Sequence, residues 1–258
     1  GVMSGSVEGR VAYQIYEGLV SPGPGDDDLR PGVASRWTVS DDGLVYTFFL
    51  RDDARWSNGD RVVAEDFREA WLRQLRGDIA SDYITFVRYL KNAEGYEGVR
   101  RLLGGLWSPV FGPLLESVVG VEVPSDDRLV VTLERPTAYF LDVVSFYTMM
   151  PVHRPTIEEF GQEAAFYADN VVTNGPYRID EYRRRNVIRM LPNSEYWAVD
   201  ELAIEEVRYF VIEDATARVT AYLDGRIDWA STPPNDQLRI LRAEPGFRSA
   251  SQLGVYYY

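Results

Sequence analysis

His153 is the only histidine in the sequence, so any reaction that needs an imidazole base would have to use it. A Ser-His-Asp hydrolase usually presents its serine in a Gly-x-Ser-x-Gly turn, and the sequence contains no such turn. A zinc hydrolase usually needs two or three histidine ligands. We therefore interpret His153 as a loop residue between Pro151 and Pro155 and predict that the protein is not an enzyme.

Other reactions also lack their usual motifs. The sequence has no cysteine, no Gly-x-x-x-x-Gly-Lys phosphate loop and no Gly-x-Gly-x-x-Gly dinucleotide fingerprint. The pairs Glu158/Glu159 and Glu205/Glu206 suggest the acid and base of a glycosidase, but adjacency in sequence does not set the distance between carboxylates that this reaction requires. With 40 acidic residues, such pairs are expected. We predict neither a cofactor nor a metal ion.

Composition limits the class of protein and its partners. The 27 basic and 40 acidic residues give a net charge of −13, which repels nucleic acid and anionic lipid surfaces. No apolar run approaches the roughly 18 residues that span a bilayer. The sequence starts at Gly1 without a signal peptide, lipid-attachment cysteine or initiator methionine, so we expect that any targeting segment has been removed. With 258 residues, 45% of them hydrophobic, the chain can bury a large core.

The first half of the sequence predicts a hairpin followed by a helix. The stretch 45–50 is rich in β-branched and aromatic residues, and Asp42-Gly43 before it is typical of a tight turn between two strands. Asn58-Gly59 marks a second turn. In the stretch 64–72, Phe67, Trp71 and Leu72 recur at helical spacing, and acidic residues occupy the first turn. We expect Trp37, Trp56 and Trp71 to serve the core.

The remainder alternates strands with short helices. Expected strands cover residues 118–123, 129–133, 177–182, 187–191 and 206–211. The stretch between Asn92 and Ser117 is loosely helical, with Leu102, Leu103 and Leu106 on one side, and is broken near Pro109. Residues 215–223 predict a helix that ends at Gly225. The sequence therefore predicts a mixed α/β fold.

Recognisable segments follow one another along the chain. They are Tyr16-Glu17-Gly18-Leu19-Val20, Pro31–Trp37, Ser40–Phe48, Asp52–Phe67, Asn174-Gly175-Pro176-Tyr177, Asn193-Ser194-Glu195-Tyr196-Trp197, Asp224–Asp228 and Tyr256-Tyr257-Tyr258. Their order resembles that in the bacterial extracellular solute-binding proteins of family 5, the peptide-binding components of ABC importers. Ala80-Ser81-Asp82-Tyr83 and Tyr89–Glu94 resemble the oligopeptide-binding subgroup.

The resemblance implies a fold of the periplasmic-binding-protein type, class II, cluster C. This chain would supply the first lobe, with a mixed-sheet subdomain formed by residues 1–16 and 152–258 and a smaller α+β subdomain inserted over residues 17–151. Relatives cross into their second lobe near the segment that matches Tyr256-Tyr257-Tyr258. We therefore expect the second lobe to be absent and the chain to be a fragment of a longer protein.

The resemblance also implies a function in transport. Relatives capture an extended oligopeptide between two lobes, by pairing its backbone with short strand segments, and deliver it to the transmembrane subunits of an ABC permease. We expect a monomer that is periplasmic or extracellular, either soluble after export or anchored as a lipoprotein, and that does not bind nucleic acid. Two alternatives stay open: a surface or signalling protein that uses the same fold for partner contact, and a peptide hydrolase.

Candidate ligand-binding residues are carried over from the resemblance. Ser4-Gly5-Ser6 match the segment whose backbone edge pairs with the peptide, although a frayed terminus or an expression remnant is an equal alternative. Tyr83 matches an aromatic residue that leans over the ligand, against the alternative of a core tyrosine. Ser231 and Thr232 match positions near the cleft and hinge. Tyr257 also matches a position near the cleft and hinge, and the alternative is a core residue of a strand.

Overall fold

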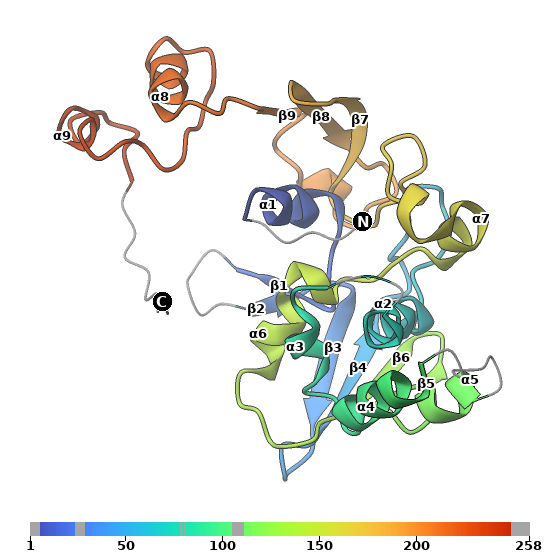
Figure 1. Ribbon diagram of the computed structural model, residues 1–258. Coiled ribbons are helices and arrows are strands. Elements are labelled where there is room, and N and C mark those ends of the chain that lie inside the picture. Colours follow the sequence, from blue (N-terminus) through green and yellow to red (C-terminus); the bar gives the residue numbers. More distant parts are fainter. Residues whose placement is uncertain (1–5, 24–28, 78, 80, 105–110, 249–258) are drawn as a thin grey trace. The chain divides into compact units, whose positions relative to one another are not determined.

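The chain forms two units in the computed structural model, which describes residues 6–23, 29–77, 79, 81–104 and 111–248 (Figure 1). The larger unit comprises Gly1–Tyr182 and Ile188–Arg208, and the smaller one comprises Arg183–Val187 and Tyr209–Tyr258. The expected insertion of residues 17–151 into a sheet-bearing subdomain stays a prediction.

A four-stranded antiparallel sheet forms the centre of the larger unit. Its strand order is β3 (Ala34–Val39), β4 (Val45–Leu50), β6 (Arg128–Thr132) and β5 (Val121–Ser125). Along β4 the side chains alternate, so that Tyr46, Phe48 and Leu50 are buried. Gly43 has φ of 69°, a conformation that glycine adopts readily, and it turns the chain from β3 into β4. The predicted hairpin is confirmed.

Helix α2 (Ala64–Arg76) packs against β5 and β6. Phe67, Trp71 and Leu72 are fully buried, because their spacing places them on the same side of the helix. The carboxylate of Asp66 accepts a hydrogen bond from the backbone N–H of Val63 and so satisfies one donor at the start of the helix. Gly77, in the left-handed conformation, ends it. The predicted helix is confirmed and extends to Arg76.

Shorter elements complete the larger unit. They are α1 (Ser6–Ile15), β1 (Val20–Pro22) paired with β2 (Leu29–Pro31), α3 (Ile84–Val87), α4 (Ala93–Leu103), α5 (Phe111–Glu116), α6 (Phe140–Ser145), η2 (Tyr147–Met149), α7 (Arg154–Ala164) and η3 (Val199–Glu201). The predicted helical stretch between Asn92 and Ser117 contains α4 and α5. Helix α4 buries Ala93, Tyr96 and Glu97 and packs against α2.

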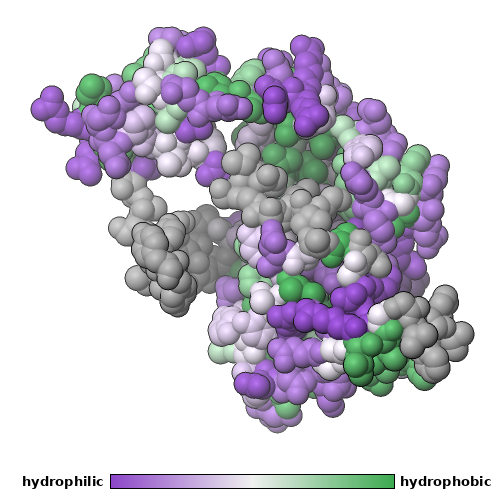
Figure 2. Space-filling model, viewed as in Figure 1, coloured by the Kyte–Doolittle hydropathy of each residue, from purple (hydrophilic) through white to green (hydrophobic). Residues whose placement is uncertain are grey.

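The expected apolar side of that stretch is not a buried face. Leu102 is 85% exposed, because the side of α4 that faces α2 is the one with Ala93 and Tyr96. Leu106 lies outside the described residues. Leu114 and Val118, in and just after α5, are also exposed. Hydrophobic residues are visible on the surface of the larger unit (Figure 2).

A three-stranded sheet and two helices follow. The strands are β7 (Tyr177–Arg183), β8 (Val187–Pro192) and β9 (Val207–Phe210), in that order in the sheet, and the helices are α8 (Ala215–Leu223) and α9 (Leu238–Leu241). The side chain of Asp214 accepts a hydrogen bond from the backbone N–H of Ala217 and caps the start of α8. The three predicted strands and the helix before Gly225 are confirmed, and so is the mixed α/β class.

Three of the recognisable segments meet at Glu17. Asn174 accepts a hydrogen bond from the Glu17 N–H and donates one to the Glu17 C=O, at 3.1 and 2.9 Å. The side-chain amide of Asn193 donates to the Gly175 C=O at 3.0 Å. At Gly175 an added Cβ would lie 2.5 Å from the backbone of Ile15, so only glycine allows the two chains to approach this closely. These segments therefore build the core of the larger unit.

The carboxyl group of Glu17 is buried at this junction. One oxygen accepts a hydrogen bond from the Tyr196 hydroxyl at 2.7 Å, and the other accepts one from the indole N–H of Trp197 at 2.8 Å. The guanidinium of Arg51 lies 3.4 Å from the centre of the Trp197 ring, in cation–π geometry. Burial nevertheless raises the pKa of Glu17 from 4.5 to about 7, against the lowering effect of both hydrogen bonds and of Arg51.

Candidate functional site

Five aromatic side chains of the larger unit form one group, the aromatic cluster. Tyr13 lies on α1, Tyr83 and Phe86 lie at α3, and Phe146 and Tyr147 lie at the start of η2. The Tyr83 ring centre is 5.1 Å from that of Phe146 and 5.8 Å from those of Phe86 and Tyr147, while Tyr13 contacts Tyr147 at 5.9 Å. These separations suit attractive ring pairs, so the cluster joins three segments that are distant in sequence.

Helix α1 approaches the cluster closely. An added Cβ at Gly9 would lie 2.8 Å from the Tyr147 ring, a distance that side chains do not tolerate. Tyr13 follows one turn later on the same side of the helix and packs its edge against the same ring. Glycine inside a helix costs stability relative to alanine, by about 1 kcal/mol. At Gly9 the helix bears this cost at the position where its backbone lies against the Tyr147 ring.

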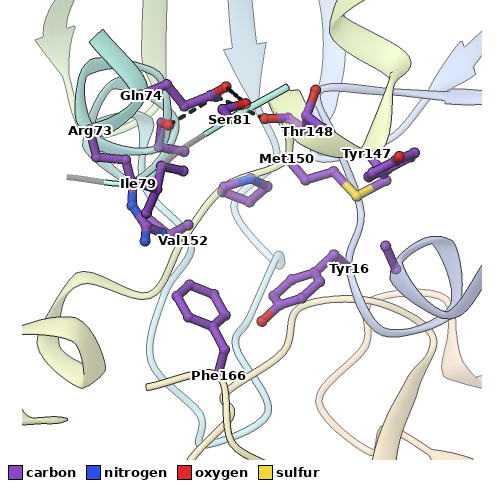
Figure 3. Close-up of a pocket in the computed structure, with 13 residues that line it drawn as sticks. Tyr16, Arg73, Gln74, Ile79, Ser81, Tyr147, Thr148, Met150, Val152 and Phe166 are labelled. Carbon is purple, nitrogen blue, oxygen red and sulfur yellow. Dashed lines mark hydrogen bonds between the residues drawn. The ribbon is translucent and has the colours of Figure 1, made fainter. Parts of the chain in front are cut away.

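A cavity of about 80 Å³ lies beside the cluster (Figure 3). Tyr147 and Ser81 belong to its walls, which connects the cavity with the segments that carry the cluster. Gln74, Ser81 and Thr148 lie on one side, with Tyr16 and Phe166 on the other (Figure 3). The cavity has room for several water molecules or the end of a small side chain.

A buried cation belongs to the same walls. Arg73 is 2% exposed, and its guanidinium carbon lies 5.1 Å from the centre of the Phe166 ring. Tyr16 is also buried, which raises the pKa of its hydroxyl, while the positive charge of Arg73 acts in the opposite direction. The cavity therefore combines apolar walls with a fixed positive charge and several hydrogen-bonding groups.

The side-chain amide of Gln74 connects the walls of the cavity. Its oxygen accepts a hydrogen bond from the Ser81 hydroxyl at 2.9 Å, and its nitrogen donates to the C=O groups of Thr148 and Ala70 at 3.1 and 3.3 Å. The Ser81 oxygen also accepts a hydrogen bond from the Tyr83 N–H at 3.3 Å. Helix α2 is thereby tied to two of the three segments that bring aromatic residues to the cluster, those at α3 and η2.

Of the predicted ligand residues, Tyr83 is the one that belongs to the aromatic cluster. It is half-buried, it precedes α3, and its ring lies at the centre of the aromatic cluster. Ser6 is the first residue of α1, and Ser4, Gly5 and Tyr257 lie outside the described residues.

Ser231 and Thr232 belong to the smaller unit, in the segment that follows α8. Thr232 has φ of 54°, a backbone conformation that is strained for a β-branched residue. Their role near a cleft stays a prediction.

Sequence reasoning did not identify the other members of the site. Tyr13, Phe86, Phe146 and Tyr147 read as ordinary apolar positions, and Gln74 reads as a polar residue of a helix surface. The adjacent pair Phe146-Tyr147 just before a proline-bounded segment was the one available signal. Membership of the cluster depends on long-range packing, which the local pattern does not contain.

His153 forms a structural contact. It is buried and caps the start of α7, where its ring nitrogens lie 2.5 Å from the Thr156 hydroxyl and 2.9 Å from the Asp60 carboxylate. Trp56 and Trp71 are fully buried as predicted, whereas Trp37 is half-buried. Within the described ranges, no three His, Cys, Asp or Glu residues gather as a metal site. None of the described helices is long and apolar enough to span a membrane.

Comparisons with solved structures agree with this architecture. An oligopeptide-binding protein of an ABC transporter from Borrelia burgdorferi, OppAIV, superposes with a TM-score of 0.84 at 28% identity over 95% of this chain and 46% of that chain. Haemophilus influenzae OppA, solved in complex with the peptide RPPGFSPFR, gives a TM-score of 0.83 at 29% identity over 93% of this chain and 45% of that chain.

Sequence comparison gives the same result. The oligopeptide-binding protein OppA of Bacillus subtilis is 30% identical over the whole of this chain, and the chain spans 46% of that protein's length. The periplasmic OppA of H. influenzae is 31% identical over 98% of the chain, which again spans 45% of the relative. The profile of the bacterial extracellular solute-binding proteins, family 5 Middle, matches residues 28–258. The predicted resemblance is thus confirmed, and the chain belongs to family 5 of the bacterial extracellular solute-binding proteins.

Proposed function

We propose that this chain is part of the substrate-binding component of an ABC importer, and that the complete protein captures extended oligopeptides between two lobes. The aromatic cluster with its adjoining cavity is the observation that carries this proposal. Flat rings offer contact to the planar amides of any peptide backbone, and a small cavity beside them accepts the end of a side chain or water. Such a surface favours binding that depends little on the peptide's sequence.

The peptide-binding relatives support the peptide as ligand. H. influenzae OppA was solved with a nine-residue peptide, and the part of it that matches this chain has the same fold. In our proposal Tyr83 packs its ring along the peptide backbone. Ser4-Gly5-Ser6 offer a backbone edge, and Ser231, Thr232 and Tyr257 lie near the cleft.

The remaining features of the proposal follow from the family. The protein works outside the cytoplasmic membrane, as a monomer that is free after export or held by a lipid anchor, and hands its ligand to the permease without catalysis. The net charge of −13 disfavours binding to nucleic acid.

Ligand identification tests the proposal. The complete gene product that carries these residues is purified from its native compartment and denatured, and the released molecules are identified by mass spectrometry. We expect a mixture of short peptides. Titration calorimetry with synthetic peptides and with the constituent free amino acids then measures Kd for each. Tight binding of a non-peptide solute, with no heat from any peptide, would refute the proposal.

The variant Tyr83→Ala tests the proposed contact. Removal of a ligand contact weakens peptide binding by about 1–3 kcal/mol. Tyr182→Ala is the control, because Tyr182 lies on β7 and is 53% exposed. If Tyr83 served only packing, its removal would lower the free energy of unfolding by roughly 3–5 kcal/mol and leave Kd unchanged.

A further inference from the structure

The side chain of Gln74, on α2, hydrogen-bonds to both segments that carry the aromatic cluster at α3 and η2. Residues 81–86 bring Tyr83 and Phe86, and residues 146–149 bring Phe146 and Tyr147. The second segment has another tie to α2, since the indole N–H of Trp71 donates to the Met149 C=O at 2.8 Å. The first segment is tied to α2 by the hydrogen bond between Ser81 and Gln74.

The partners of Gln74 fix the orientation of its amide. Thr148 and Ala70 present carbonyl oxygens, which only accept, so the nitrogen of the amide must face them. The amide oxygen is left for the Ser81 hydroxyl, which donates to it and accepts from the Tyr83 N–H. Three groups therefore form one chain of hydrogen bonds in a single direction, from Tyr83 through Ser81 to Gln74. Gln74 is 3% exposed, so its amide depends on partners inside the protein rather than on bulk water.

The backbone at Tyr83 sets the position of its ring. Tyr83 is the residue before α3, and its N–H bond to Ser81 closes the turn that leads into this four-residue helix. A helix this short has little stability of its own, so the turn before it determines where its side chains lie. A change at Gln74 is thus transmitted to Tyr83 through Ser81, without direct contact between the two.

We propose that Gln74 is a positioning residue for peptide binding, which holds Tyr83 and Tyr147 in the ring arrangement that receives the ligand. This inference rests on the proposed function. The side chain of Gln74 acts on Tyr83 through Ser81, and on the segment of Tyr147 through the Thr148 C=O. Isosteric loss of the amide, as in Gln74→Met, leaves the volume filled and removes both ties at once. Loss of the hydroxyl, as in Ser81→Ala, removes one tie, and Ser81→Thr restores it.

The test measures binding and ring position in the complete gene product. We expect Gln74→Met and Ser81→Ala to raise Kd for a bound peptide by about 3- to 10-fold, which corresponds to one or two lost hydrogen bonds, with Ser81→Thr close to the wild type. In combination with Tyr83→Ala, Gln74→Met should add little further loss, because both changes remove the same positioned ring. With 3-fluorotyrosine at position 83, the ¹⁹F resonance should shift or broaden in Gln74→Met and Ser81→Ala without any peptide.

Asn193→Ala is the matched control. Asn193 is also a buried amide that ties two segments together, through the Gly175 C=O and the Glu195 N–H, and neither bond involves a member of the aromatic cluster. It should lower thermal stability and leave both Kd and the ¹⁹F resonance unchanged. If Gln74→Met failed to fold, the pair Ser81→Ala and Ser81→Thr would still test whether the hydrogen bonds of Ser81 position Tyr83.

The outcomes separate this inference from the proposed function. Peptide binding that Tyr83→Ala weakens, together with an unchanged Kd in Gln74→Met and Ser81→Ala, would overturn only the role of Gln74. Additive losses in the double variant would show that Gln74 acts independently of Tyr83 and would overturn its role in positioning that ring. A wild type that binds no peptide would overturn the proposed function, and the role of Gln74 in binding with it.

Discussion

Replacement of Glu17 by glutamine should make the protein more stable than the wild type, and increasingly so as the pH rises. Glu17 is 6% exposed, and burial raises its pKa to about 7. Glutamine has the same shape as the protonated acid. Its oxygen accepts from the Trp197 N–H, and its amide nitrogen donates to the Tyr196 oxygen. The substitution therefore mimics the neutral form and removes the titration.

The size of the effect follows from the shift of the pKa between the unfolded and folded states. Between pH 4.5 and about 7 the folded protein holds a proton on Glu17 that the unfolded chain has released. Stability therefore falls with rising pH across this window and levels off above it. A shift from 4.5 to about 7, at about 1.4 kcal/mol for each pH unit, corresponds to about 3 kcal/mol. The variant escapes this loss, so its advantage should grow from near zero at pH 4.5 to about 3 kcal/mol above pH 7.

Urea unfolding at pH 4.5, 6 and 8 measures this difference. Other titrating groups are common to both proteins, and their contributions cancel when the two free energies of unfolding are subtracted. Glu94→Gln, at an exposed position on α4, is the control for the loss of one carboxyl group. A Glu17→Gln difference that is flat with pH, or that favours the wild type at pH 8, would refute the reasoning. It would mean that the donors Tyr196 and Trp197 stabilise the carboxylate more than burial penalises it.

Three further substitutions test the packing. Gly175→Ala should lower the free energy of unfolding by about 2–4 kcal/mol, since its Cβ would meet the backbone of Ile15; urea unfolding measures this, and a loss below 1 kcal/mol would contradict it. Thr232→Gly should raise stability by about 1 kcal/mol, because glycine adopts a φ of 54° without strain, and an unchanged or lower melting temperature would show otherwise. Trp71→Phe leaves the Met149 C=O without its indole donor and should cost about 1–3 kcal/mol in the same unfolding assay, so a neutral result would argue against that hydrogen bond.

Local chemistry explains which elements could be predicted. Strand β4 and helix α2 carry clear periodic patterns, and Asp42-Gly43 and Gly77 mark their neighbouring turns with conformations that glycine adopts. Leu102 on α4 is exposed, because the sequence pattern of this helix does not say which side will meet α2. The side of a short helix that becomes buried is set by tertiary packing against its neighbours.

The candidate site was less predictable than the fold. Tyr83 was proposed through the resemblance, while its ring partners Phe146 and Tyr147 come from a segment far away in sequence. Gln74 is typical of a solvated helix position until the positions of Ser81 and Thr148 are known. A buried polar residue is recognised by its partners, and those are specified only when the chain has folded.

The junction at Glu17 also has a consequence for the order in which the chain folds. Its hydrogen bonds span 157, 179 and 180 positions of the sequence. During synthesis, the residues just after α1 therefore wait for these partners until Trp197 has been added, and closure of such a long loop is slow. Until then, the carboxyl group of Glu17 lacks the two donors that hold it in the folded protein.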